Sequence, residues 1–188
     1  MHRRRFDRRT ILKAAAGGAL LLFSGKAFPG PAAAGTAPPV PRGTLSLYNT
    51  HTGERLSVAY RDGNGERDPG AASALNRILR CHYTGKIAEI DPRVIDFLGA
   101  VDGSLGGGNE IHVISGFRSP EYNEKLVREG HGVARNSLHL QGRAIDFRIP
   151  GVRLNSLREA ALRLREGGVG HYPGPDFVHI DSGRFRAW

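Results

Sequence analysis

Two short stretches of the chain carry histidines and carboxylates at a spacing that suits a metal ion. The first, SLHLQGRAID, sets His139 seven residues before Asp146, with Gly142 between them to let the chain turn. The second, FVHID, places His179 and Asp181 near the end of the sequence. Two neutral imidazoles and one carboxylate, from His139, His179 and Asp146, can converge and leave a fourth position open. This set is typical of a catalytic zinc site, since a structural site is normally closed by four protein ligands.

Both stretches also have the alternating pattern of half-buried β-strands, in which successive side chains point to opposite faces. The apolar residues of each stretch recur at every second position, and each proposed metal ligand of a strand falls between two of them. The face expected to be apolar holds Ile145, Phe147, Ile149, Val178 and Ile180, and the opposite face holds Ala144, Asp146, Arg148, Phe177, His179 and Asp181.

Most of the eight histidines of the chain are expected to be ordinary surface or helix-face residues. His51 is expected in a solvated hairpin turn, and His82 on the stripe of a helix. A single histidine and a single carboxylate would therefore be weak evidence for a metal. The joint pattern of the two stretches is what favours the site.

The joint pattern, S-x-H-x-x-G-x-A-x-D followed by V-H-x-D, resembles the D-Ala-D-Ala peptidase branch of the LAS zinc metallopeptidases. The segments ISGFRSPEYN, GVARNSLHLQGRAIDFRIPGV and GGVGHYPGPDFVHIDSGRFRAW are similar to the murein endopeptidase K type of that group. The resemblance extends over residues 44–188. It implies one zinc ion per chain and hydrolysis of peptide crosslinks in bacterial peptidoglycan. The bond would join stem peptides through a D-Ala–diaminopimelate or a diaminopimelate–diaminopimelate link.

Two other functions remain open on the sequence. A D,D-carboxypeptidase that trims a terminal D-Ala from stem peptides would carry the same ligand motif. A non-catalytic, zinc-stabilised wall-binding domain is the second, because hedgehog signalling domains keep a metal site of this type for binding.

The resemblance also implies catalytic residues. Arg118 lies in S-G-F-R-S, at a strand-to-helix junction, and the matching arginine of the related peptidases faces the scissile carbonyl. A fixed guanidinium can stabilise the negative charge that develops on that oxygen.

The general base is less certain from the sequence. Many D-Ala-D-Ala peptidases carry a glutamate three residues before the distal histidine, and here that position is Asp176. Other members use a histidine two residues before it, and here that position is Phe177. The candidates are Asp181 and Asp176, ranked close together, and then His171. Asp181 has an alternative role as an acceptor that orients a ligand imidazole.

The first residues have the features of an export signal. Arg8-Arg9-Thr10-Ile11-Leu12-Lys13 resembles the twin-arginine motif, and the apolar run at 14–23 is too short to span a bilayer. An A-x-A site follows at 32–34, and no cysteine for a lipid anchor follows the run. We therefore expect a signal peptide at 1–34, a Pro/Ala-rich spacer at 35–43 and one domain at 44–188. The partner would be the twin-arginine export machinery, and the mature protein would be periplasmic without a stable membrane anchor.

The charge of the chain is largely a property of this signal. Residues 1–34 hold seven of the 27 basic residues and one of the 18 acidic ones, so the remainder carries only about +3 of the total +9. Nucleic acid is therefore not an expected partner. The single cysteine, Cys81, cannot form an intramolecular disulfide and is expected to be buried.

The sequence patterns around the proposed site predict both strands and helices, and therefore an α+β fold. A hairpin is expected from 44–48 and 55–60, and a buried strand at 111–114. Helices are expected to open at Asp68-Pro69, at Asp91-Pro92, at Ser119-Pro120 and at Ser156, the last from capping-box spacing with Glu159. Together these predict a small antiparallel sheet that bears the zinc ligands, with helices on its other side, as in an LAS-type peptidase fold.

Overall fold

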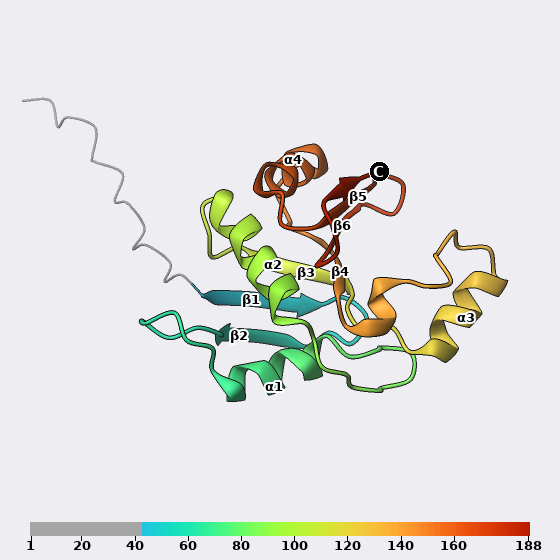
Figure 1. Ribbon diagram of the computed structural model, residues 1–188, viewed down its shortest axis with the longest axis horizontal. Coiled ribbons are helices and arrows are strands. Elements are labelled where there is room, and N and C mark those ends of the chain that lie inside the picture. Colours follow the sequence, from blue (N-terminus) through green and yellow to red (C-terminus); the bar gives the residue numbers. More distant parts are fainter. Residues whose placement is uncertain (1–42) are drawn as a thin grey trace, which may run out of the picture. The chain divides into compact units, whose positions relative to one another are not determined.

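The computed structural model describes residues 43–188, which form a sheet with helices on both of its sides (Figure 1). The expected signal peptide and all of the expected spacer except Gly43 lie outside the described residues. None of the helices within 43–188 has the length and apolar character that crossing a bilayer requires. The strands are β1 (Thr44–Asn49), β2 (Arg55–Ala59), β3 (Glu110–Ser115), β4 (Ala144–Arg148), β5 (Gly168–Tyr172), β6 (Phe177–Asp181) and β7 (Arg186–Ala187). The helices are α1 (Pro69–Ile78), α2 (Pro92–Ser104), α3 (Pro120–Arg128), the 3₁₀-helix η1 (Leu138–Gln141) and α4 (Leu154–Leu164).

The strands form one sheet in the order β2-β1-β3-β4-β6-β5-β7. The pairs β1–β2, β3–β4, β4–β6 and β5–β6 are antiparallel, which confirms the predicted hairpin and the mainly antiparallel sheet. The pairs β1–β3 and β5–β7 are parallel, so the sheet is mostly rather than entirely antiparallel. The long connection through β2, α1 and α2 makes the first of these pairs feasible, because parallel neighbours need a crossover rather than a tight turn.

Three of the four expected helix starts are confirmed by their caps. The side chains of Asp68, Asp91 and Ser119 each accept a backbone N–H of the first turn, and proline follows each cap. The fourth start was wrong, because α4 begins at Leu154 rather than at Ser156 and has no side-chain cap. Leu154 packs against the core and extends the apolar stripe of this helix by one turn, which explains the earlier start.

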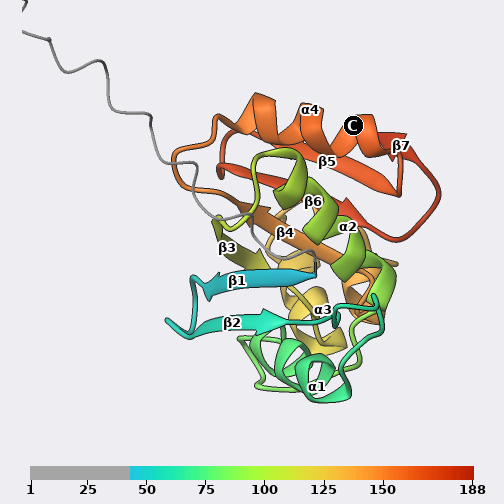
Figure 2. The ribbon, with the colours of Figure 1, turned by 90° about the vertical axis from the view of Figure 1, so that its left-hand side faces the viewer.

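The core lies between the sheet and the pair α2 and α4. Both helices contact β6 and also contact each other, and Figure 2 gives a view in which α2 crosses in front of the sheet with α4 beside it. Ile145 pairs with Ile180, and Phe147 with Val178, and all four side chains are fully buried. Asp146 pairs with His179 on the opposite face, as the alternation predicted. The apolar face of the sheet is therefore covered by α2 and α4, and its opposite face carries Asp146 and His179.

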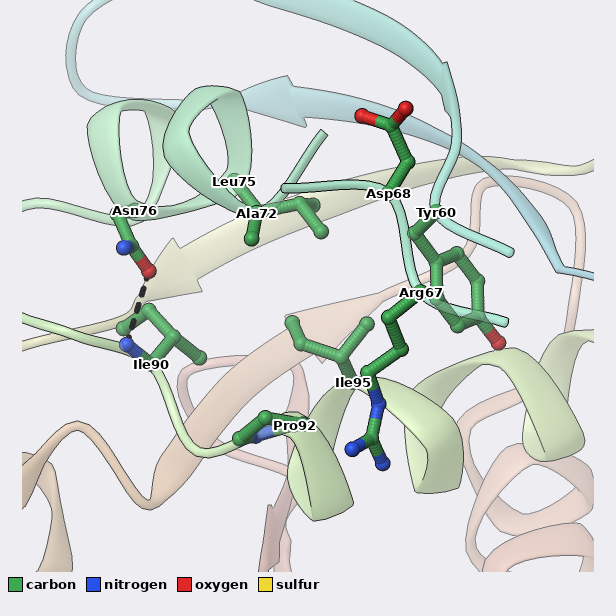
Figure 3. A pocket seen from close by; sticks show the side chains of 9 residues that line it. All are labelled: Tyr60, Arg67, Asp68, Ala72, Leu75, Asn76, Ile90, Pro92 and Ile95. Atoms are coloured by element: carbon green, nitrogen blue, oxygen red, sulfur yellow. Dashed lines mark hydrogen bonds between the residues drawn. The ribbon is translucent and has the colours of Figure 1, made fainter. Parts of the chain in front are cut away.

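A small cavity of roughly 40 Å³ lies between α1, the start of α2 and Tyr60 (Figure 3). Its wall is mainly apolar, and on one side the Asn76 Oδ1 accepts the backbone N–H of Ile90 at 2.9 Å. None of the residues predicted to form a site lines it. We regard it as a packing gap beside the core that is separate from His139, Asp146 and His179.

Candidate metal centre

The three predicted metal ligands come from three neighbouring elements. His139 lies in η1, Asp146 in β4 and His179 in β6. The turn between the first two depends on Gly142, which adopts φ +64° where a Cβ would collide with the carbonyl oxygen of Glu89. The antiparallel register then places Asp146 directly beside His179. Local sequence and strand pairing together bring the three side chains to one point.

The atoms at that point are close enough to hold one ion. One ligand atom from each residue lies within 4.8 Å of the others, and all three residues are buried. The Asp146 Oδ1 is 2.7 Å from the His179 Nδ1, and the Asp146 Oδ2 is 3.2 Å from the His139 Nε2. The two imidazoles lie edge to face, with 3.2 Å between the His139 Nε2 and the His179 Nδ1. Three donors therefore share one small space.

The other nitrogen of each imidazole has its own acceptor. The His139 Nδ1 lies 2.7 Å from the carbonyl oxygen of Gly116, and the His179 Nε2 lies 3.1 Å from the Asp181 Oδ2. When these nitrogens donate, the His139 Nε2 and the His179 Nδ1 turn their lone pairs toward Asp146. Two imidazole lone pairs and a carboxylate form a set that suits zinc, and three protein ligands leave a position open for chemistry.

The electrostatics of the three residues differ. Burial lowers the pKa of His139, and this outweighs the attraction of Asp146. Burial also disfavours the cation of His179, but its hydrogen bonds to Asp146 and Asp181 prevail and raise its pKa to about 9. Burial favours the neutral form of Asp146, yet the two imidazoles hold the pKa of this carboxyl below its usual range. A metal at this centre would therefore bind a carboxylate and displace a proton from His179.

Arg118 lies beside the ligands and is only 6% exposed. Its backbone N–H donates to the carbonyl oxygen of His139 at 3.0 Å, its Nη1 to the Asn123 Oδ1 at 3.2 Å, and its Nη2 lies 3.6 Å from the Asp146 Oδ2. Burial lowers the pKa of this guanidinium, against the attraction of Asp146, but an arginine remains charged in a protein. Among the described residues, its buried Nε–H has no acceptor.

The structure brings one of the three candidate bases to the centre. Asp181 is fully buried, and its oxygens accept from His179, from Arg186 and from the backbone N–H groups of Gly168 and Gly183. Its pKa is low, because these hydrogen bonds outweigh the effect of burial. These contacts occupy the acceptor positions of the carboxylate, as the orienting role requires.

The other two candidates lie elsewhere. The side chain of Asp176 is 62% exposed, its carboxylate accepts from the Arg148 Nη1 at 3.4 Å, and it does not line the cleft around the centre. His171 pairs with Val178 in the β5–β6 register, so its side chain is on the apolar face of the sheet, opposite His179.

The centre opens into a cleft of roughly 680 Å³. Its walls include His51 and Tyr172, and also Tyr122, Leu126, His131 and Trp188, which the sequence patterns did not single out. The Tyr172 hydroxyl accepts from the Trp188 Nε1 at 2.8 Å, and the Tyr172 ring stacks on Phe177. Tyr172 and Phe177 are paired residues of one hairpin, so the β5–β6 pattern contained a signal for them. The sequence held no such signal for Trp188, because its position depends on the pairing of β7 with β5.

The positions of His82 and His51 differ from those expected from the sequence. His82 is not on a helix, because α1 ends at Ile78 and His82 lies in the turn that follows. Its ring stacks on His51 with 3.7 Å between centroids, and His51, although exposed, lines the cleft. The hairpin turn is thus part of the cleft wall.

Comparison with known proteins assigns the family. The family described as peptidoglycan L,D-endopeptidase MepK, of the M15 peptidases, matches residues 37–188. The protein named peptidoglycan L,D-endopeptidase MepK from Escherichia coli (strain K12) is 43% identical over 160 residues, covering 85% of this chain and 87% of that protein. The protein named probable peptidoglycan L,D-endopeptidase MepK from Haemophilus influenzae is 40% identical over 151 residues, covering 80% of each. The chain belongs to this family of M15 peptidases.

Proposed function

We propose that the chain is a zinc-dependent endopeptidase that hydrolyses peptide crosslinks between the stem peptides of peptidoglycan. One observation carries this proposal: a buried His-Asp-His donor set lies beside a buried arginine that has an unused N–H. The family supports a peptidase, and the names of the relatives support an L,D-endopeptidase that acts on peptidoglycan.

His139, Asp146 and His179 are the residues that would hold the zinc ion. When bound, zinc supplies Lewis-acid chemistry, in which water is activated near neutral pH and a carbonyl is polarised. The chain supplies the orientation: the Gly116 carbonyl fixes the imidazole of His139, and Asp181 fixes that of His179. We assign Asp181 to this orienting role, because its acceptor positions are already taken.

Arg118 is the donor for the charge that develops on the scissile carbonyl oxygen. It lines the cleft together with the metal-type residues, and Asn123 holds one of its Nη atoms. A donor fixed before the reaction needs no rearrangement when negative charge appears, so its stabilisation is specific for the transition state. The buried location strengthens the interaction, because little water screens it.

The position of the donor set within the cleft favours an endopeptidase over a carboxypeptidase. In the strand order of the sheet, β4 and β6, which carry Asp146 and His179, lie between the β1–β2 pair and the β5–β7 pair. The cleft is lined by His51 from the β1–β2 turn and by Tyr172 from β5, so it extends to both sides of the donor set. A crosslink has peptide on both sides of the scissile bond, and a site with two lined sides can hold both. The relatives named as endopeptidases support the same choice.

The location of the substrate requires export. We propose that residues 1–34 act as a twin-arginine signal and deliver the domain to the periplasm, where peptidoglycan is accessible. The transporter that reads this signal carries folded proteins, so zinc could be loaded before translocation.

Digestion of purified peptidoglycan tests this function. The zinc-loaded protein should convert crosslinked muropeptide dimers into monomers, which mass spectrometry identifies by the bond that was cut. The matched His139→Ala variant should leave the dimers intact. Release of terminal D-Ala from monomers, with the dimers untouched, would instead establish a carboxypeptidase, and retention of the polymer without any cleavage would establish a binding domain.

A further inference from the structure

The last strand, β7, carries an arginine that contacts the metal centre indirectly. The Arg186 Nη2 donates to the Asp181 Oδ2 at 2.7 Å, and its Nη1 donates to the Asp181 Oδ1 at 3.1 Å. The same Asp181 Oδ2 lies 3.1 Å from the His179 Nε2. A continuous series of contacts therefore joins Arg186, Asp181 and the proposed ligand His179.

The carboxylate in the middle of this series is fully buried. A buried carboxylate is costly unless hydrogen bonds and an opposite charge compensate for the water that it has lost. Within residues 43–188, Arg186 is the one arginine or lysine that forms an ion pair with Asp181. Its two-pronged contact fixes the plane of the carboxylate as well as its charge, which a single-point contact would not do.

The surrounding backbone leaves room for this pair. Gly168 is paired with Arg186 in the β5–β7 register, and a Cβ on Gly168 would collide with both the Asp181 Oδ2 and the Arg186 Nη1. On its other side, the Arg186 guanidinium lies 4.8 Å from the centre of the Trp188 ring. The side chain is thus confined between a strand and an aromatic ring, although it is 37% exposed.

We infer that Arg186 is a positioning residue for the metal ligand His179, acting through Asp181. Arg186 holds the plane of the Asp181 carboxylate, and Asp181 accepts the N–H of the His179 Nε2. That hydrogen bond keeps the lone pair of the Nδ1 directed at Asp146 and His139. This inference rests on the proposed zinc site and adds to it the residue that sets the orientation of one ligand.

The measurement is the zinc dissociation constant, determined by competition with a chromophoric chelator. Arg186→Gln should weaken zinc binding by up to about 10- to 100-fold, the range for losing a direct partner of a ligand, since Arg186 acts on His179 only through Asp181. Arg186→Lys keeps the charge but not the fork, so its affinity should lie between those of wild type and Arg186→Gln. Arg184→Gln is the matched control, because Arg184 is an exposed arginine two residues before Arg186, and the zinc affinity of this variant should equal that of wild type. Equal affinities for Arg186→Gln and wild type would overturn the inference.

A double-mutant cycle tests the route through Asp181. If Arg186 acts through Asp181, the Asp181→Asn/Arg186→Gln double variant should bind zinc about as weakly as Asp181→Asn alone. Fully additive losses would overturn the inference. The melting temperature of each metal-free variant is measured in parallel. A loss of affinity that is matched by collapse of the metal-free fold would show that Arg186 merely fastens β7, and this too would overturn it.

The outcome is separable from that of the proposed function. If wild type itself binds no zinc, or if His139→Ala binds it as tightly as wild type, the proposed zinc site fails. If wild type requires His139 but Arg186→Gln binds zinc normally, only the role of Arg186 fails.

Discussion

At the scale of single residues, each of the two proposed imidazole ligands is oriented by a contact outside the ligand set. The Gly116 carbonyl fixes His139, Asp181 fixes His179, and the carboxylate of Asp146 lies between the two imidazoles. Arg118 is the residue in the same space whose hydrogen-bonding capacity is not fully used. The ligand set would account for metal binding, and Arg118 for the difference between binding and catalysis.

Arg118→Lys should retain zinc and fold but lose most of its turnover. A lysine keeps the charge and loses the planar fork, and removal of one oxyanion donor costs about 2.7–4 kcal/mol, or a factor of roughly 10²–10³ in kcat. KM should change far less, because the oxyanion exists only beyond the ground state. Steady-state kinetics on a purified muropeptide dimer measures both quantities.

Asp176→Asn serves as the control for this comparison. Its carboxylate pairs with Arg148 outside the cleft, so kcat should stay at the wild-type value. Turnover by Arg118→Lys at the wild-type rate would contradict the role given to Arg118. Loss of turnover in Asp176→Asn with zinc retained would restore Asp176 as the base.

At the scale of elements, the site depends on how β4, β6 and η1 are held against the start of α2. Asp91 caps α2. Its carboxylate also accepts a hydrogen bond at 2.7 Å from the hydroxyl of Ser182, the residue that follows β6. Its backbone N–H donates to the carbonyl oxygen of Gly142, in the turn between His139 and Asp146. One residue thus connects the helix to both metal-bearing segments.

The stabilisation that Asp91 gives to the folded protein should be lost in acid. Its hydrogen bonds with Arg93 lower the pKa of its carboxyl in the folded protein, and burial opposes them only in part. The unfolded chain then takes up a proton as pH falls through about 4, where the folded protein does not. The stabilisation by Asp91 is therefore present above that pH and is lost progressively below it.

Asp91→Asn isolates this effect, because asparagine also caps helices well. Urea denaturation at neutral pH should show that it is less stable than wild type, and the difference should shrink as pH falls below about 4. Asp91→Ala also removes the cap. This adds a loss of about 0.5–2 kcal/mol in the free energy of unfolding, which should persist at low pH. A constant difference between wild type and Asp91→Asn across this range would contradict the assignment.

The sequence predicted the parts of the site that lie within one strand or turn. The alternation of β4 and β6 placed Asp146 and His179 on the face away from Ile145 and Ile180, and the cap-then-proline pairs predicted three helix starts. These signals are local, so composition and spacing contain them. The position of His171 on the apolar face was not predicted, because it requires knowing that His171 pairs with Val178.

The parts that could not be predicted depend on contacts between distant segments. Arg186 and Trp188 lie beside the centre only because β7 pairs with β5 in parallel, and a two-residue strand has no periodicity to detect. The stacking of His51 on His82 depends on the hairpin turn meeting the end of α1. The burial of Asp181 among five N–H donors could not be predicted from the sequence either, because the donors come from three separate segments.

At the scale of the whole molecule, the proposed twin-arginine signal would deliver the peptidase domain to its peptidoglycan substrate. Replacing both Arg8 and Arg9 by lysine should leave the protein in the cytoplasm, because the transporter reads the paired arginines rather than the positive charge. Cell fractionation measures this, and Arg4→Lys, which lies outside the motif, should be exported normally. Export of the double variant as efficiently as wild type would refute the twin-arginine route and leave the zinc site untouched.

Cleavage of crosslinks should require a single zinc ion held by His139, Asp146 and His179. The most direct measurement is a zinc titration of the metal-stripped protein, in which cleavage of a purified muropeptide dimer is followed at each addition. We predict no cleavage without metal, an increase in proportion to bound zinc, and a plateau at one equivalent per chain. Cleavage by the metal-stripped protein at the rate of the zinc-loaded one would contradict the claim.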